Sequence, residues 1–272
     1  MPRGRRRTVQ GRGVQALSAG TLSLSAMPGN PLLHFDARTG VTFDAGTERV
    51  SAWANLGSAG TAGDVGQDTS SEQPLYKAAA FGTGRPGILY DGSDDLLWRD
   101  YSGLNIQTWS CVVGYAYSHG ASNFHQGALG GNSISAVEAN STAYYRGFGC
   151  QPVAPSNTKA FQLYNGNLDG IQIAQNIRES TSASPTDTPF AVGGTWFWNG
   201  ANNILTASIE GSTATIGSMT ADADRPGTLQ AFSVGRYVHG CLEGYMIRAI
   251  TWPRVLSQVE LNRATRVMKG GM

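Results

Sequence analysis

The chain has 272 residues, of which 36 are glycine and 11 are proline; 14% are charged, and the formal net charge is +1. A hydrophobic fraction of 40% with so little net charge excludes wholesale disorder, and a chain of this length can bury a large core without disulfides or metals. No run of about 18 apolar residues occurs, which excludes a membrane-spanning helix, so we expect no membrane partner.

The first 30 residues contain five arginines and no acid, which leaves a net charge of −4 on the rest of the chain. We predict that residues 1–30 form an extended basic arm, because clustered arginines repel one another until they meet opposite charge. A solvated tail and a signal peptide with its apolar part at residues 14–27 are the alternatives. The residues that would anchor the arm are Arg3, Arg5, Arg6, Arg7 and Arg12.

After the arm, strand patterns alternate with turn signals. Residues 108–117 place alternate aromatic and apolar side chains on one face, which is typical of a half-buried strand. No amphipathic helix separates the strands, so we predict an all-β, two-sheet antiparallel sandwich over residues 31–272. Further strands are expected at 87–90, 96–99, 170–174, 190–198, 204–209, 229–234 and 245–252, with turns at Asp91-Gly92, Asn165-Gly166 and Glu210-Gly211 among others.

One helix is expected, close to the end of the sequence. Ser257 and Glu260 have the spacing of a capping box, in which each side chain accepts a hydrogen bond from a backbone N–H of the other residue. An apolar stripe of Val259, Leu261, Val267 and Met268 follows, and Gly270-Gly271 ends the helix. This short helix should pack on the sandwich.

Several short segments follow one another in a distinctive order. They are Leu33-His34-Phe35-Asp36-Ala37, residues 50–55, Gln73-Pro74-Leu75, residues 88–97, 190–195, 205–211, 233–236 and 242–245, and residues 250–260. In this order they resemble the laminin G-like, concanavalin A-like jelly-roll family of bacteria and their phages. The resemblance covers roughly residues 31–270 and implies a jelly-roll fold. The family includes glycan-binding modules, adhesion domains and virion proteins, so the fold alone does not assign a function.

Three aspartates, Asp91, Asp94 and Asp95, lie between two apolar runs. Short acidic side chains can accept hydrogen bonds from their own backbone in a tight turn, which is the structural interpretation we favour. Some relatives in the family bind calcium, so the resemblance leaves these three residues as a possible calcium site. We otherwise expect no cofactor.

Catalytic carboxylates are not indicated. Jelly-roll glucanases carry closely spaced acids on one strand, because alternate residues project into the same cleft. The seven glutamates here are isolated from one another, so we predict no catalytic residues and a protein that is not an enzyme.

Aromatic residues offer candidate binding positions. Trp196 and Trp198 fall on one face of a strand that ends in an Asn-Gly turn, and Tyr144 and Tyr145 lie in a Gly-rich segment. If these four side chains are exposed, they would stack on sugar rings or anchor an interface. For the tryptophan pair, burial in the core is the interpretation that we favour. We assign Trp53, Trp98 and Trp109 to the core.

From these features we predict a structural protein of a phage virion, serving in capsid decoration or as a tail or baseplate accessory. Its partners would be other virion proteins, through the basic arm, in a homo-oligomer within the assembly; we do not expect nucleic acid contact. The alternative is an extracellular carbohydrate-binding or adhesion module that recognises host-surface glycans.

The three cysteines are predicted to differ in role. We predict that Cys111 is a small buried residue, whereas Cys150 or Cys241 would be available for interchain disulfides.

Overall fold

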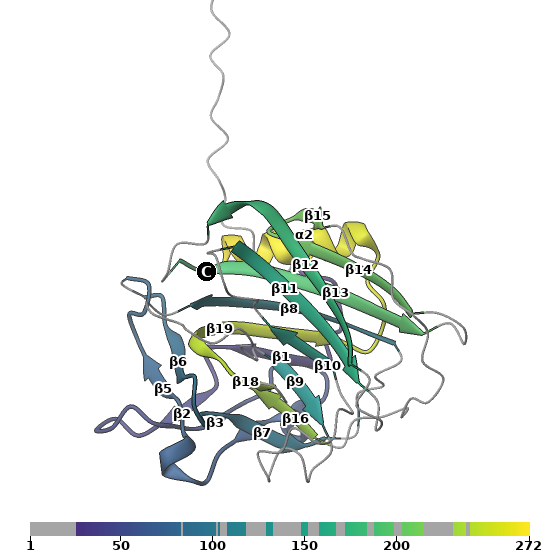
Figure 1. The fold of residues 1–272 in the computed structure, drawn as a ribbon. Helices are drawn as coiled ribbons and strands as arrows, with labels where there is room; N and C mark the ends of the chain where they lie inside the picture. Colours follow the sequence, from purple (N-terminus) through teal and green to yellow (C-terminus); the bar gives the residue numbers. More distant parts are fainter. Residues whose placement is uncertain are drawn as a thin grey trace, which may run out of the picture.

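The computed structural model describes residues 26–82, 84–101, 103, 108–117, 129–132, 148–151, 158–166, 172–183, 188–198, 203–214, 231–237 and 240–272. These residues form two antiparallel sheets packed face to face, with one helix outside the sandwich (Figure 1). The predicted all-β jelly-roll sandwich is therefore confirmed. No helix in the described ranges is long and apolar enough to cross a membrane.

In the described part of the chain, the first sheet has eight strands. Its order is β15, β14, β13, β8, β19, β6 and β5, and β1 pairs with β19 beside β6. The strands are β1 (Leu33–Asp36), β5 (Leu75–Lys77), β6 (Gly87–Asp91), β8 (Thr108–Tyr117), β13 (Phe190–Trp198), β14 (Asn203–Ile209), β15 (Ser212–Ala214) and β19 (Glu243–Trp252).

The second sheet has nine strands among the described residues, in the order β12, β11, β10, β9, β16, β7, β4, β3 and β2. They are β2 (Val41–Phe43), β3 (Val50–Trp53), β4 (Val65–Gly66), β7 (Leu97–Asp100), β9 (Leu129–Asn132), β10 (Phe148–Gln151), β11 (Thr158–Gly166), β12 (Gln172–Ala183) and β16 (Ala231–Val234). A small ribbon of β17 (Arg236–Tyr237) and β18 (Gly240–Cys241) and two 3₁₀ turns, η2 (Gly60–Gly63) and η3 (Ser70–Glu72), complete these elements.

The main core lies between the two sheets and is rich in aromatic side chains. Phe35 packs against Trp53 and Phe232, with ring centroids 5.5 and 6.0 Å away, and Tyr115 lies 4.2 Å from Phe190. All five side chains are buried. Close packing of such large side chains gives the sandwich its hydrophobic stabilisation.

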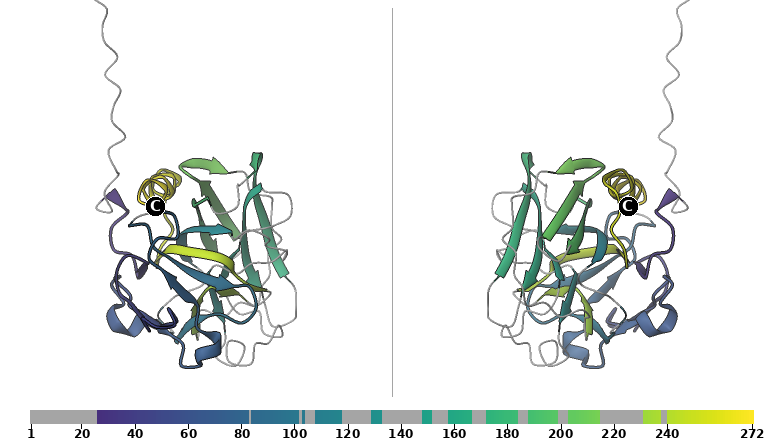
Figure 2. Two further views of the ribbon diagram at one scale, coloured as in Figure 1. Left: turned by 90° about the vertical axis from the view of Figure 1, so that its left-hand side faces the viewer. Right: turned by 90° about the vertical axis from the view of Figure 1, so that its right-hand side faces the viewer.

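A second core lies between the outer face of the eight-stranded sheet and α2 (Gln258–Gly270), which Figure 2 shows lying along one side of the sandwich. The sequence predicted a half-buried β8, but this helix covers its second face, where Val112 is buried. Gly193 of β13 permits the close approach, because an added Cβ would lie 2.7 Å from Val112 Cγ2 and 3.1 Å from Leu261 Cδ1. Both faces of this part of the sheet are therefore core.

The capping box that the sequence predicted is present at Ser257 and Glu260. The predicted apolar stripe was wrong in one member, since Val259 is 79% exposed. The buried residues of the helix are Leu261, Ala264, Thr265, Val267 and Met268.

A charged group is buried beneath the end of α2. Arg248 of β19 is fully buried, and its Nη2 lies 2.8 Å from Asp36 Oδ2. Arg38 shares this carboxylate, with its own Nη2 2.6 Å from Asp36 Oδ2. Hydrogen bonds from Arg38 and the positive charges of both arginines lower the pKa of Asp36 despite its burial. The ion pairs therefore connect β1, β19 and the segment after β1.

Candidate functional site

One partly exposed tryptophan, Trp98, lies on the outer face of the nine-stranded sheet. Successive side chains of a strand point to opposite faces, and in β7 Leu97 belongs to the main core while Trp98 does not. Trp98 instead packs on a small separate cluster of Leu96 and Ala231. Its ring is thus supported from beneath and open to solvent on part of its surface.

Small residues flank Trp98 across the sheet. In the pairing register Trp98 is opposite Gly66 of β4 on one side and Ser233 of β16 on the other. An added Cβ on Gly66 would meet a single atom within 4 Å, Ser51 O at 3.1 Å, so the space above Gly66 is otherwise open. The row continues through Ala52 in one direction and through Gly130, Gly149 and Tyr164 in the other.

We call Ala52, Gly66, Trp98 and Ser233 the Trp98 strip. Ala52, Gly66 and Trp98 are partly exposed in this strip, whereas Ser233 is buried. A partly exposed indole can stack against the apolar face of a ring while neighbouring polar groups bind its hydroxyls. The arrangement is suited to holding a flat polar ligand.

The sequence interpretation of the other tryptophans had mixed outcomes. Trp53 and Trp109 are buried in the core as predicted, but the assignment of Trp98 to the core was wrong. Trp196 is fully buried and lies opposite Trp109 in the register, so its alternative role in stacking on a glycan is wrong as well. The neighbouring Phe197 is 37% exposed on the outer face of the eight-stranded sheet.

Other predicted positions lie outside what the structure describes. Trp198 pairs with Asn203 in the backbone register, but its side chain is not among the described ones, and neither are Tyr144 and Tyr145. The same applies to the arm residues Arg3, Arg5, Arg6, Arg7 and Arg12 and to the side chains of Cys150 and Cys241. Cys111 is a buried free thiol, as predicted.

The end of the predicted arm contacts the sandwich. Met27 packs against the second core, beside α2, and Pro28 O accepts a hydrogen bond of 3.0 Å from the indole N–H of Trp252. Leu32 N then donates to Thr251 O. The chain is therefore fixed to the body from Met27, a few residues before the expected boundary at residue 30.

The three aspartates at the end of β6 and in the loop after it do form a turn, as the sequence predicted. Asp91 Oδ1 accepts from Ser93 N at 2.8 Å, and Asp95 Oδ2 accepts from Asp91 N at 2.9 Å. Carboxylate oxygens of Asp91, Asp94 and Asp95 lie within 4.8 Å of one another, a spacing compatible with a hard cation. The loop is nevertheless hydrogen-bonded without one.

Burial changes the pKa of Asp95 more than the neighbouring negative charges do. Asp95 is 5% exposed, and burial raises its pKa to about 6, with further contributions from the charges of Asp91 and Asp94 that exceed the effect of its hydrogen bond. Holding this carboxylate ionised at neutral pH therefore costs free energy. A cation bound to the loop would reverse that cost.

Comparisons with known proteins identify the class of fold. No protein-family model matches the chain, and no curated protein matches it. Among solved structures, domain 4 of AbnA, a GH43 extracellular arabinanase from Geobacillus stearothermophilus solved in complex with arabinotriose, has a TM-score of 0.53 at 11% identity, covering 87% of this chain and 98% of that domain.

A second solved structure belongs to a larger enzyme. Trypanosoma rangeli sialidase, in complex with a difluoro sugar acid, has a TM-score of 0.52 at 9% identity, covering 89% of this chain and 33% of the sialidase. Likenesses at such low identity define the fold. The protein is a jelly-roll β-sandwich, the fold that it shares with these two structures.

Proposed function

We propose that this protein is a carbohydrate-binding module and that the Trp98 strip is its binding surface. The observation that carries the proposal is Trp98 itself, a supported and partly exposed indole beside Gly66 on the outer face of a sheet. Sugars present apolar C–H faces that stack on aromatic rings, and the absent side chain at Gly66 leaves room for a ring to lie flat.

The comparisons support this proposal through the fold. Domain 4 of the arabinanase covers nearly the same length of chain and was solved with arabinotriose, so a domain of this shape holds an oligosaccharide. Arabinan fragments are therefore the first ligands to test. A module of this type works outside the cell or on a particle surface, where polysaccharides are met.

We propose a role in binding rather than catalysis. Several described acids already have partners: Glu260 pairs with Arg254 at 2.8 Å, and Glu48 pairs with Lys77. Asp36 is held by two arginines.

The direct test is retention on polysaccharides, using affinity electrophoresis on arabinan, xylan, glucan and chitin derivatives. We expect retention on at least one polymer, and we expect Trp98→Ala to weaken it tenfold or more, with Trp98→Phe in between. Phe197→Ala is the matched control, because Phe197 is an exposed aromatic residue on the outer face of the opposite sheet. Equal loss in both alanine variants, or no retention on any polymer, would contradict the proposal.

A second candidate function rests on the basic arm. Five arginines without an acid in residues 1–30 favour attachment to an acidic protein surface, such as that of a phage particle, where the module would be displayed. Removing residues 1–25 leaves the contacts of Met27 and Pro28 in place. We expect the shortened chain to fold but no longer to incorporate into particles; full incorporation would refute the anchor.

A further inference from the structure

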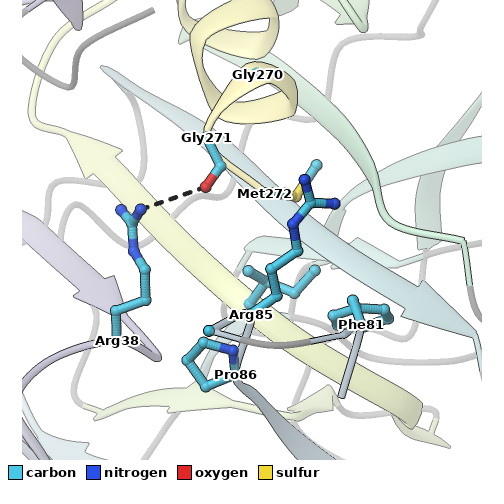
Figure 3. Close-up of a pocket in the computed structure, with 9 residues that line it drawn as sticks. Arg38, Phe81, Arg85, Pro86, Gly270, Gly271 and Met272 are labelled. Carbon is cyan, nitrogen blue, oxygen red and sulfur yellow. Dashed lines mark hydrogen bonds between the residues drawn. The ribbon is translucent and has the colours of Figure 1, made fainter. Parts of the chain in front are cut away.

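A cavity of about 240 Å³ lies outside the eight-stranded sheet, on the other side of the molecule from the Trp98 strip. Figure 3 shows it between the end of α2 and the loop before β6, with Arg38 and Arg85 extending toward the helix end from two different segments. Pockets for drug-sized ligands are about 300–1,000 Å³, so this one has the size for a single small ring. Its walls are Arg38, Phe81, Gly84, Arg85, Pro86, Ile247 and residues 270–272.

Positive charge is in excess at this cavity. Arg38 and the buried Arg248 share the single carboxylate of Asp36, at 2.6 and 2.8 Å. Arg85 is exposed, and in the described part of the chain no ion pair joins it to an acidic group. The guanidinium groups of Arg38 and Arg85 therefore line the cavity, and that of Arg248 is buried beside Asp36. The same excess is felt at His34, whose pKa is lowered by burial and by the charges of Arg248 and Arg38.

The carbonyl end of α2 does not cancel this charge. A helix carries partial negative charge at its C-terminal end, and Arg38 meets it by donating from Nη1 to Gly271 O at 3.4 Å. Arg248 lies under the same turn, since an added Cβ on Gly271 would be 3.0 Å from its Nη1. Because Arg38 and Arg248 already neutralise the partial negative charge at the end of α2, the guanidinium of Arg85 can bind a solute.

The remaining wall is apolar and firmly held. The ring of Phe81 packs edge-on against Tyr245, with centroids 5.1 Å apart, and Pro86 and Ile247 are buried. The backbone N–H of Phe81 donates a hydrogen bond of 3.3 Å to Arg85 O, which holds the aromatic wall and the arginine in one turn. An aromatic wall beside a planar guanidinium suits a ring that carries one anionic group.

We propose that this cavity binds a monosaccharide-sized ring bearing a carboxylate, such as a hexuronic acid. The guanidinium of Arg85, with the free N–H groups of Arg38, pairs with the carboxylate, because the fork of N–H donors matches the two oxygens. The ring lies against Phe81 and Pro86. This is a second site that does not depend on the Trp98 strip, so either site can fail in experiment without the other.

The test is isothermal titration of the full chain with glucuronate and galacturonate, alongside glucose and the methyl ester of glucuronic acid. We expect the acids to bind at least tenfold more tightly than glucose or the ester, and Arg85→Gln to remove that preference while Arg85→Lys keeps part of it. The matched control is Arg263→Gln, an exposed arginine of α2 away from the cavity. Trp98→Ala should leave uronate binding unchanged.

Three results would overturn the proposal. The first is no binding of either acid by the wild-type chain. The second is an equal loss of binding in the Arg85 and Arg263 variants, which would indicate general charge attraction. The third is complete competition by acetate at concentrations equal to the uronate, because then the carboxylate alone would account for binding and the apolar wall would contribute nothing.

Discussion

The two sheets of the sandwich have outer faces of opposite character. On the eight-stranded sheet, α2 and Met27 cover a second core, and a guanidinium is fully buried beneath the helix. On the nine-stranded sheet, Ala52, Gly66 and Trp98 are only partly buried on the outer face. The outer face of the eight-stranded sheet is therefore part of the core, whereas that of the nine-stranded sheet presents an aromatic side chain to solvent. Substitutions on the two faces should therefore affect different measurements.

The largest effect should come from removing the carboxylate beneath the helix. Asp36→Ala leaves Arg248 buried without its ion-pair partner, which typically costs about 3–5 kcal/mol of unfolding free energy. Urea denaturation followed by circular dichroism measures it. Asp68→Ala, an exposed acid, is the control and should change stability by less than about 0.5 kcal/mol. A cost below about 1 kcal/mol for Asp36→Ala would show that the covered face does not depend on this pair.

Two glycines sharpen the contrast between the faces. Gly193→Ala inserts a methyl group between β8 and α2, 2.8 Å from Cys111 O, and should cost about 1–3 kcal/mol. Gly66→Ala meets only Ser51 O at 3.1 Å and should change stability little while reducing glycan retention. Denaturation and affinity electrophoresis on both variants check this. The same stability loss in both would remove the distinction.

The acidic loop provides a pH-dependent prediction. Because the pKa of Asp95 is raised to about 6, the folded protein binds more protons than the unfolded chain between about pH 4 and 6. This group therefore makes stability fall as pH rises through that window. Asp95→Asn can still accept from Asp91 N, and should stabilise the protein by about 1–2 kcal/mol at pH 8 and have no effect near pH 4.

Calcium makes the same variant a test of the metal prediction. If the loop binds the ion, millimolar calcium chloride should raise the melting temperature of the wild type at pH 8 but not that of Asp95→Asn, because binding to the folded state alone stabilises it. Equal responses in the two proteins would leave the loop as a turn only.

The smallest effect is expected at the start of α2. The pKa of Glu260 is lowered to about 2, first by Arg254 and then by the backbone of Ser257. A lowered pKa adds stability above the unfolded value of about 4.5, and this is lost as the pH falls toward 2. Glu260 is partly exposed, so Glu260→Gln should cost only about 0.5 kcal/mol at pH 7. A cost that persists at pH 2 would exclude the charge as its cause.

The sequence predicted local structure well where the pattern was strong. Strands β8 and β13 coincide with the predicted alternating segments, and the capping box of α2 was found from two residues. The turn at Glu210-Gly211 is present, with both residues at positive φ, as a two-residue hairpin of this type requires.

The candidate site could not be predicted in the same way. Alternation shows that Leu97 and Trp98 point to opposite faces, but it does not say which face is inside. That depends on pairing with β4 and β16, which are distant in the sequence. The same limit applied to Trp196, whose burial follows from its position opposite Trp109 in β8. The cavity lined by Arg38 and Arg85 depends on where α2 docks. The sequence predicted that the helix packs on the sandwich, but no local pattern specifies its position there.

The antiparallel pairing of β1 with β19 brings the start of the folded body beside the helix that follows β19, on the covered side of the sandwich. Anything joined ahead of Met27, whether an arm, a fusion partner or a solid support, is consequently attached on the side away from the Trp98 strip. A protein immobilised through its first residues should keep its aromatic surface facing outward, able to meet polymers far too large to enter a pocket.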